Sequence, residues 1–246
     1  MNRRALRLAL PVLAGAVLTT PAMADNWEMY ITVDNYFDVY FGTGISTTGA
    51  AVGSGNSWPT EYFFTAVSSP LTSYVYIVTS SDLAVAQGLI ADFRNVTTNQ
   101  NALSGDGNWA VFPAGAYAAT NPFWPAPWPA NTIATQAMVD NAINYATNNG
   151  LWVTPTGAPG YDNDPTTPTA PFAYPWAYYP NIDPSAQWVW YDSGNGSLNP
   201  GIPAPLGGGV NHDEFLVFRI PVDVPAPGAC VLLGLGGLAA GRRKRD

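Results

Sequence analysis

The stretch WEMYITVDNYFDVYF, from Trp27 to Phe41, alternates apolar and polar side chains and carries the turn formers Asp34-Asn35 at its centre. An apolar repeat of two residues is typical of a strand that buries only one face. The stretch therefore predicts two successive strands that face a common core. The side chains predicted to face it are Trp27, Met29, Ile31, Val33, Phe37, Val39 and Phe41.

Further strand patterns occur on both sides of a central region of different composition. They are predicted at Glu61–Val67, Tyr74–Thr79, Gly88–Phe93, Gln187–Tyr191 and Glu214–Val222, the last with Leu216, Phe218, Ile220 and Val222 facing one way. The single cysteine, Cys230, lies outside this region, so no disulfide can form within it. About 200 residues are enough to bury a core without a disulfide. Residues 25–224 are therefore predicted to form one all-β domain.

The central region is rich in proline and is predicted to be a long insertion of ordered Pro-aromatic loop. Thirteen of the twenty-three prolines fall between Pro113 and Pro184, and proline cannot donate to a sheet ladder. One short helix is expected inside it, starting near Asn131 or Thr132 and ending at Gly150. The helical spacing is carried by Ile133, Ala137, Met138 and Ile143.

The first 24 residues have the pattern of a secretory signal peptide. Arg3, Arg4 and Arg7 precede an apolar stretch that is followed by Ala22-Met23-Ala24. The apolar part is about half the roughly 20 residues that a membrane span needs. Cleavage after Ala24 and export of the remaining chain are therefore expected.

The last 22 residues, 225–246, combine an apolar run with a basic end. The run from Ala229 to Ala240 is predicted to be a transmembrane helix. Bases behind such a run stay on the cytoplasmic side, which holds the preceding body outside. The bases are Arg242, Arg243, Lys244 and Arg245, and the residues ahead of the run are Val224, Pro225, Ala226, Pro227 and Gly228.

This C-terminal arrangement resembles the PEP-CTERM sorting signal of exported Gram-negative proteins, which is named for a Pro-Glu-Pro motif. The chain departs from the motif at Ala226, where the family has Glu. The resemblance implies an exosortase-type processing enzyme as a partner and transient residence in the inner membrane. It also implies a final location at the cell surface or in the extracellular matrix.

The body between the two terminal segments is strongly acidic. Residues 25–224 hold two bases, Arg94 and Arg219, against sixteen acids, which leaves a net charge of −14. Such a body is repelled by phosphate backbones. Nucleic acid is therefore excluded as a partner.

The inventory of chemically active side chains predicts a noncatalytic protein without a cofactor. His212 is the only histidine and the body has no cysteine, which leaves no residues for a thiolate or His-Cys metal site and only one histidine on which a Ser-His-Asp site could be built. Two alternatives rest on carboxylates: glycoside hydrolysis by Asp162 with Asp164 or by Asp213 with Glu214, and calcium binding by YDNDPTTP, residues 161–168. That segment lacks the glycine and terminal Glu of a dedicated calcium loop, so a solvated turn is the favoured interpretation.

Aromatic side chains in the Pro-rich loops are the candidate ligand-binding residues. Sugar rings stack on aromatic faces, and polar side chains receive their hydroxyls. The candidates are Trp124, Trp128, Tyr174 and Trp176, with Tyr178 beside them. The alternative is that these rings pack against each other and hold the insertion on the sandwich. A structural role is predicted for Trp27, Trp58, Trp188 and Trp190.

The order of the strands resembles the galactose-binding-like jelly roll, an accessory sugar-binding module found beside many glycoside hydrolases. The matching positions are Asp34, Asn35, Trp58, Gly88, Leu89, Asp92, Trp188 and Trp190. The chain departs from the family in the long loop FGTGISTTGAAVG, residues 41–53. The resemblance implies a jelly-roll β-sandwich and binding of carbohydrate or extracellular matrix polysaccharide. The alternative is a structural or adhesive component of the envelope or biofilm with no specific sugar ligand.

Overall fold

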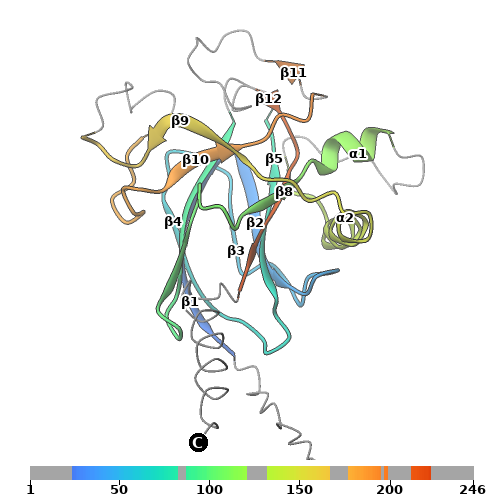
Figure 1. The fold of residues 1–246 in the computed structure, drawn as a ribbon, viewed down its shortest axis with the longest axis horizontal. Coiled ribbons are helices and arrows are strands. Elements are labelled where there is room, and N and C mark those ends of the chain that lie inside the picture. The colour runs from blue at the N-terminus through green and yellow to red at the C-terminus, as the bar shows by residue number, and fades with distance from the viewer. Residues whose placement is uncertain are drawn as a thin grey trace, which may run out of the picture.

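The computed structural model describes residues 24–82, 87–120, 132–166, 177–194, 197–198 and 212–222 (Figure 1). The predicted signal peptide, up to residue 23, and the predicted sorting segment lie outside these residues. So do the predicted ligand-binding residues Trp124, Trp128, Tyr174 and Trp176. Among the described residues, no helix has the length and apolarity needed to cross a membrane.

The first sheet is antiparallel and is built around the two longest strands. In spatial order it contains β4 (Tyr62–Val67), β1 (Asn26–Asp34), β6 (Gly88–Asn95), β10 (Gln187–Trp190) and β9 (Thr156–Asp162). A further strand, β7 (Gln100–Leu103), pairs with the second half of β6, while β10 pairs with β6 near its start, at Leu89. Two strands therefore lie end to end along one side of β6.

The second sheet is also antiparallel and packs against the first. Its order is β3 (Gly53–Gly55), β2 (Tyr36–Gly42), β5 (Tyr74–Ser80), β13 (Val217–Pro221) and β8 (Ala110–Phe112). A separate pair is formed by β11 (Ser197–Leu198) and β12 (His212–Asp213). The all-β sandwich predicted from the sequence is confirmed.

The predicted core positions lie between the two sheets. The seven inward-facing residues of the Trp27–Phe41 stretch are all buried, as are Leu216, Phe218, Ile220 and Val222, and all belong to one hydrophobic cluster. The turn at Asp34-Asn35 does not form a hairpin, because β1 belongs to the first sheet and β2 to the second. It carries the chain across the sandwich.

The outer face of the second sheet is covered by helix α2 (Gln136–Asn148) (Figure 1). Its apolar side packs with the outward-facing residues of β2, β5 and β13 in a second cluster that includes Tyr40, Tyr76, Val217, Val139 and Ile143. The cap is Thr135, whose hydroxyl accepts a hydrogen bond from the Met138 amide at 3.4 Å. The predicted start was therefore too early, and Ile133 precedes the helix. The predicted end is confirmed, since Gly150 follows the helix with a φ of +64°.

The proline-rich region contributes more regular structure than the sequence predicted. It supplies a short second helix, α1 (Ala114–Thr120), and it supplies β9, which extends the first sheet beyond β10. The region is therefore partly built into the sandwich and is not only an insertion of loops.

Candidate functional site

Four tryptophans that were assigned structural roles are found in or against the core. Trp27, Trp188 and Trp190 are buried in the cluster between the sheets, and Trp58 packs against it. Trp188 also contacts the ring of Tyr179, with ring centroids 6.0 Å apart. The structural role predicted for these four tryptophans agrees with their places in or against the core.

A pair of stacked aromatic rings lies on the outer face of the first sheet. Because Met29 and Ile31 point into the core, the alternation of β1 turns Tyr30 outward. Phe63 of β4 stands directly opposite Tyr30 in the strand register. The two ring centroids are 4.6 Å apart with an interplanar angle of 28°, and Phe63 is 49% exposed. We call these two residues the Tyr30–Phe63 pair.

A buried carboxylate fixes a guanidinium beside this pair. Arg94 of β6 reaches over the Tyr30 ring, with Cζ 5.3 Å from the ring centroid. Its Nη2 donates to Oδ2 of Asp92 at 2.6 Å, and Asp92 is fully buried. The hydrogen bond to Asp92 raises the pKa of Arg94. Since β1 lies between β4 and β6, Tyr30 is flanked by Phe63 on one side and by Arg94 on the other.

The loop from Tyr179 to Ala186 borders the pair on the side toward the start of β6. Asn181 donates from its backbone amide and from Nδ2 to the Glu61 carboxylate, at 3.0 and 2.6 Å. Arg94 donates to the Asn181 carbonyl at 3.3 Å. The Asp183 amide donates to Oδ2 of Asp92 at 3.2 Å. Side chains of the first sheet therefore hold this loop in place.

Asn163 holds the loop from Tyr179 to Ala186 through hydrogen bonds to the loop backbone. It is buried, and its Nδ2 donates to the carbonyls of Tyr179 and Ile182 at 2.7 and 2.6 Å. Its Oδ1 accepts from the Tyr179 amide at 3.0 Å. One amide side chain thus satisfies three backbone groups of the loop, which keeps the border rigid.

A shallow hollow of about 280 Å³ adjoins the pair on its other side. It is formed by the first residues of β1 and the last residues of β4, and it is lined by Asn26, Trp27, Glu28, Thr65, Ala66, Val67 and Val96. Glu28 is one row from Tyr30 on the same face, and in the register it stands between Thr65 and Arg94. The strand register places the pair, the loop border and the hollow next to one another on the first sheet, and we call them together the sheet-face site.

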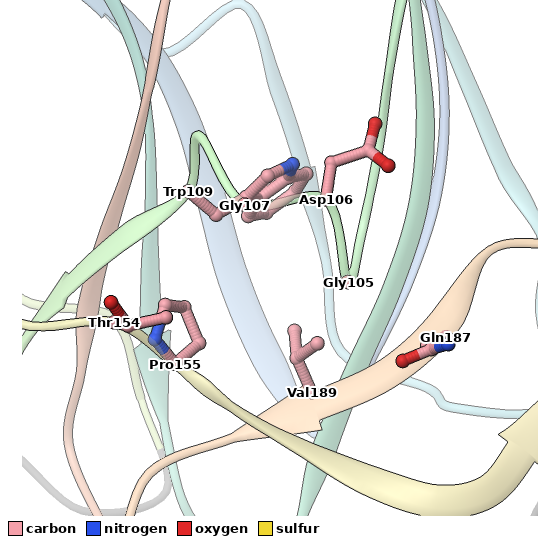
Figure 2. Close-up of a pocket in the computed structure, with 8 residues that line it drawn as sticks. All are labelled: Gly105, Asp106, Gly107, Trp109, Thr154, Pro155, Gln187 and Val189. Atoms are coloured by element: carbon pink, nitrogen blue, oxygen red, sulfur yellow. The ribbon is translucent and has the colours of Figure 1, made fainter.

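A second pocket, shown in Figure 2, is much smaller. It holds about 70 Å³ and is lined by Gly105, Asp106, Gly107, Trp109, Thr154, Pro155, Gln187 and Val189. Ligand pockets usually measure about 300 Å³ or more, so this pocket is too small for a sugar ring. The Trp109 indole that faces it belongs to the core cluster and contacts Phe93 and Phe218.

Three of the four carboxylates considered for hydrolysis or calcium binding, Asp162, Asp164 and Glu214, accept local hydrogen bonds. Asp162 accepts from the Asp164 amide at 3.1 Å, and Asp164 accepts from the amide and hydroxyl of Thr166 at 2.8 and 2.7 Å. Glu214 is buried and accepts from the amide and hydroxyl of Ser193. The described part of the chain contains no cluster of three His, Cys, Asp or Glu side chains that could hold a metal ion.

Comparison of the chain with known protein families, curated proteins and solved structures finds no match. The sheet-face site is therefore characterised by its own geometry. Sequence reasoning did not identify it, although one signal was present. Tyr30 occupies a solvent-facing position of the alternation, where a polar residue is usual. An aromatic ring at such a position indicates a surface that contacts a ligand or another protein.

Proposed function

We propose that the chain is an exported, noncatalytic protein that binds carbohydrate at the sheet-face site. The observation that carries the proposal is the stacked Tyr30–Phe63 pair with Phe63 half exposed on an open sheet face. The exposed part of the Phe63 ring, backed by the Tyr30 ring, offers a platform for a pyranose ring. Polar groups for the sugar hydroxyls stand on both sides of it, in Glu28, Glu61 and Arg94.

Stacking should supply most of the affinity. A sugar hydroxyl exchanges a hydrogen bond with water for one with protein, at a net gain of about 1 kcal/mol. Each ring face that is covered removes apolar area from water at roughly 25 cal/mol per Å². The polar groups would then orient the sugar and discriminate between ligands.

The charge around the pair favours a glycan without anionic groups. Arg94 is paired with Asp92, so it offers little free positive charge. Glu28 and Glu61 leave the surface negative, in a body that carries a net charge of −14. Uronate or sulfate groups would be repelled. A neutral or amine-bearing polysaccharide is therefore the proposed ligand class.

The location follows from the terminal segments. The signal peptide directs export, and the C-terminal segment attaches the chain to the inner membrane until an exosortase-type enzyme processes it. Extracellular polysaccharide would be the ligand available to the protein after this step. Trp124, Trp128, Tyr174 and Trp176 stay candidates for a second contact with the same polymer.

A glycan array probed with the wild-type chain and with Phe63→Ala tests the proposal. We expect binding to neutral or amino glycans and a loss of about tenfold in affinity in Phe63→Ala, which corresponds to about 1.4 kcal/mol. Leu71→Ala is the control, because Leu71 is another large apolar side chain, 75% exposed, and lies outside the sheet-face site and outside the Pro-rich loops. Unchanged binding by Phe63→Ala would refute the site.

The second candidate function, a structural or adhesive component, is favoured by one observation. Within the described residues, β4 is at the edge of the first sheet, and its sequence YFFTAV contains no charge, proline or glycine. Edge strands usually carry such residues to prevent pairing with other chains. If no glycan on the array binds and the chain pairs with other chains through β4, this alternative replaces carbohydrate binding.

A further inference from the structure

The two ends of the folded body leave the sandwich on the same side, at the bottom of Figure 1. The Asp25 carbonyl, just before β1, accepts a hydrogen bond from the Ser68 amide at 2.9 Å. Val222, just after β13, donates from its amide to the Ser73 carbonyl at 2.9 Å. Ser68 and Ser73 are the two ends of the connection between β4 and β5. Both ends of the body are therefore tied to one short loop.

Three loops form this end of the sandwich, and none of them contains a charged residue. They connect β2 to β3 (residues 43–52, TGISTTGAAV), β4 to β5 (residues 68–73, SSPLTS) and β6 to β7 (residues 96–99, VTTN). Strand register brings them to one end, because Gly42 pairs with Tyr74, Asn26 with Val67, and Trp27 with Asn95. We call these three loops the uncharged end.

Exposed apolar side chains concentrate at the same place. Seven large apolar side chains are exposed in the described part of the chain, and four of them lie in these loops or next to them. These four are Ile45, Val67, Leu71 and Val96, of which Leu71 is 75% exposed. Apolar groups gathered on one surface of a soluble domain mark a contact with a protein or a membrane.

Acids lie at both ends of the sandwich. Next to the uncharged end, the Asp140 carboxylate of α2 accepts from the amide and hydroxyl of Thr47 at 2.7 and 2.8 Å, and the buried Asp25 carboxylate accepts from Asn95.

Other acids stand at the opposite end. Asp34 ends β1 there, and Asp82 follows β5. Glu214 precedes β13, and its carboxylate is bonded to Ser193, next to Asp192. Because the three loops carry no charge of their own, an anionic surface repels the uncharged end less than the end that carries Asp82 and the exposed Asp192.

We infer that the uncharged end docks onto the lipid surface of the membrane before the chain is processed. This inference rests on the proposed attachment through the C-terminal segment. The apolar run begins at Ala229, seven residues after Val222, a reach of at most about 25 Å even when fully extended. The uncharged end is thus held near the bilayer, with its apolar side chains within reach of the headgroup and acyl boundary. Docking there would cover Val67 and Val96, which also line the hollow of the sheet-face site, and would leave the Tyr30–Phe63 pair, farther along β1 and β4, open to the side.

The test places a fluorescent probe at each end of the sandwich. Cys230→Ser removes the only cysteine, and pyrene is then attached at Ile45→Cys, Leu71→Cys or Val96→Cys, with Asp192→Cys as the control at the opposite end. All four positions are exposed, so labelling should leave the thermal midpoint unchanged. The chain with its C-terminal segment intact is reconstituted into phosphatidylcholine vesicles that contain a spin-labelled lipid quencher.

We expect the chain to float with the vesicles and to lose pyrene fluorescence at positions 45, 71 and 96 but not at position 192. Flotation without quenching at the first three positions would overturn the docking inference while leaving the membrane attachment intact. Failure to float would overturn the attachment and the docking together. An excimer signal without quenching would show that a second copy of the chain, and not lipid, covers this end.

Discussion

The Nη2 atom of Arg94 lies 2.6 Å from Oδ2 of Asp92, in a pair whose carboxylate is fully buried and whose guanidinium is partly exposed. The same Oδ2 atom accepts from the backbone amide of Asp183. One carboxylate of β6 therefore positions both the cation beside Tyr30 and the loop that borders the sheet-face site.

Replacing this carboxylate should destabilise the protein. Asp92→Ala leaves the Asp183 amide and part of the Arg94 guanidinium without their acceptor, and an unpaired buried donor costs about 1–3 kcal/mol. Because Arg94 reaches solvent, we expect a loss of about 1–2 kcal/mol in the free energy of unfolding, measured in urea. Glu28→Ala, on the same face, is the control and should change it by less than about 0.5 kcal/mol. Equal effects of the two substitutions would refute the role given to Asp92.

Two glycines in and next to β3 of the second sheet should differ sharply in how much stability is lost when each is replaced by alanine. A Cβ at Gly55 would overlap the fully buried ring of Phe37 and lie 2.7 Å from Cε2 of Tyr62. Gly55→Ala should therefore cost about 1–3 kcal/mol of stability through overpacking. Gly49→Ala, in the loop before β3, meets no atom within 4 Å and should be neutral. Thermal midpoints of the two variants check this, and a stable Gly55→Ala variant would contradict the packing of β3.

Asp38 should make stability depend on pH in a defined direction. Desolvation by burial raises the pKa of Asp38 above its ordinary 3.8, although the Tyr40 hydroxyl donates to it at 3.0 Å. The folded chain therefore binds this proton more readily than the unfolded chain, and the cost of ionising Asp38 is relieved as the pH falls through its raised pKa.

The variant Asp38→Asn removes that cost at every pH. It should be at least as stable as the wild type at neutral pH, and its advantage should shrink as the pH is lowered toward 3.8. Urea unfolding of both chains between about pH 7 and about pH 4 measures the difference. An advantage that grows on acidification would show that the sign is wrong.

The mature chain should begin at Asp25. Asp25 is buried, its amide donates to the Ser68 hydroxyl at 3.1 Å, and its carboxylate accepts from Asn95 at 3.0 Å. Signal-peptide cleavage after Ala24 would therefore leave the first fixed residue of the sandwich at the new N-terminus. Mass spectrometry of exported protein checks this, and a mature chain that starts within the sandwich, after Asp25, would contradict it.

The sequence was sufficient to predict the sandwich because its long strands bury only one face. The alternation from Trp27 to Phe41 is strict enough to identify the core positions. Shorter or irregular strands could not be predicted from the alternation, for physical reasons. β8 has only three residues, and β9 contains Pro159, which is compatible with its place at the edge of the first sheet.

The sheet-face site could not be predicted from the sequence because it depends on register. Tyr30 and Phe63 are 33 positions apart in the sequence, and they stack because β1 and β4 pair with these two residues opposite each other. A shift of one residue would turn Phe63 into the core. The hydrogen bonds of Asn163 to Tyr179 and Ile182 likewise depend on the path of the loop that leads into β10, which the sequence pattern does not reveal.

Hydroxyl-radical footprinting of the chain, with and without the glycan that binds most tightly on the array, tests the central claim most directly. We expect bound glycan to protect Tyr30 and Phe63 from oxidation while the exposed Leu71 and Val153 react as before. Protection confined to Trp124, Trp128, Tyr174 and Trp176, with Phe63 unchanged, would contradict binding at the sheet-face site.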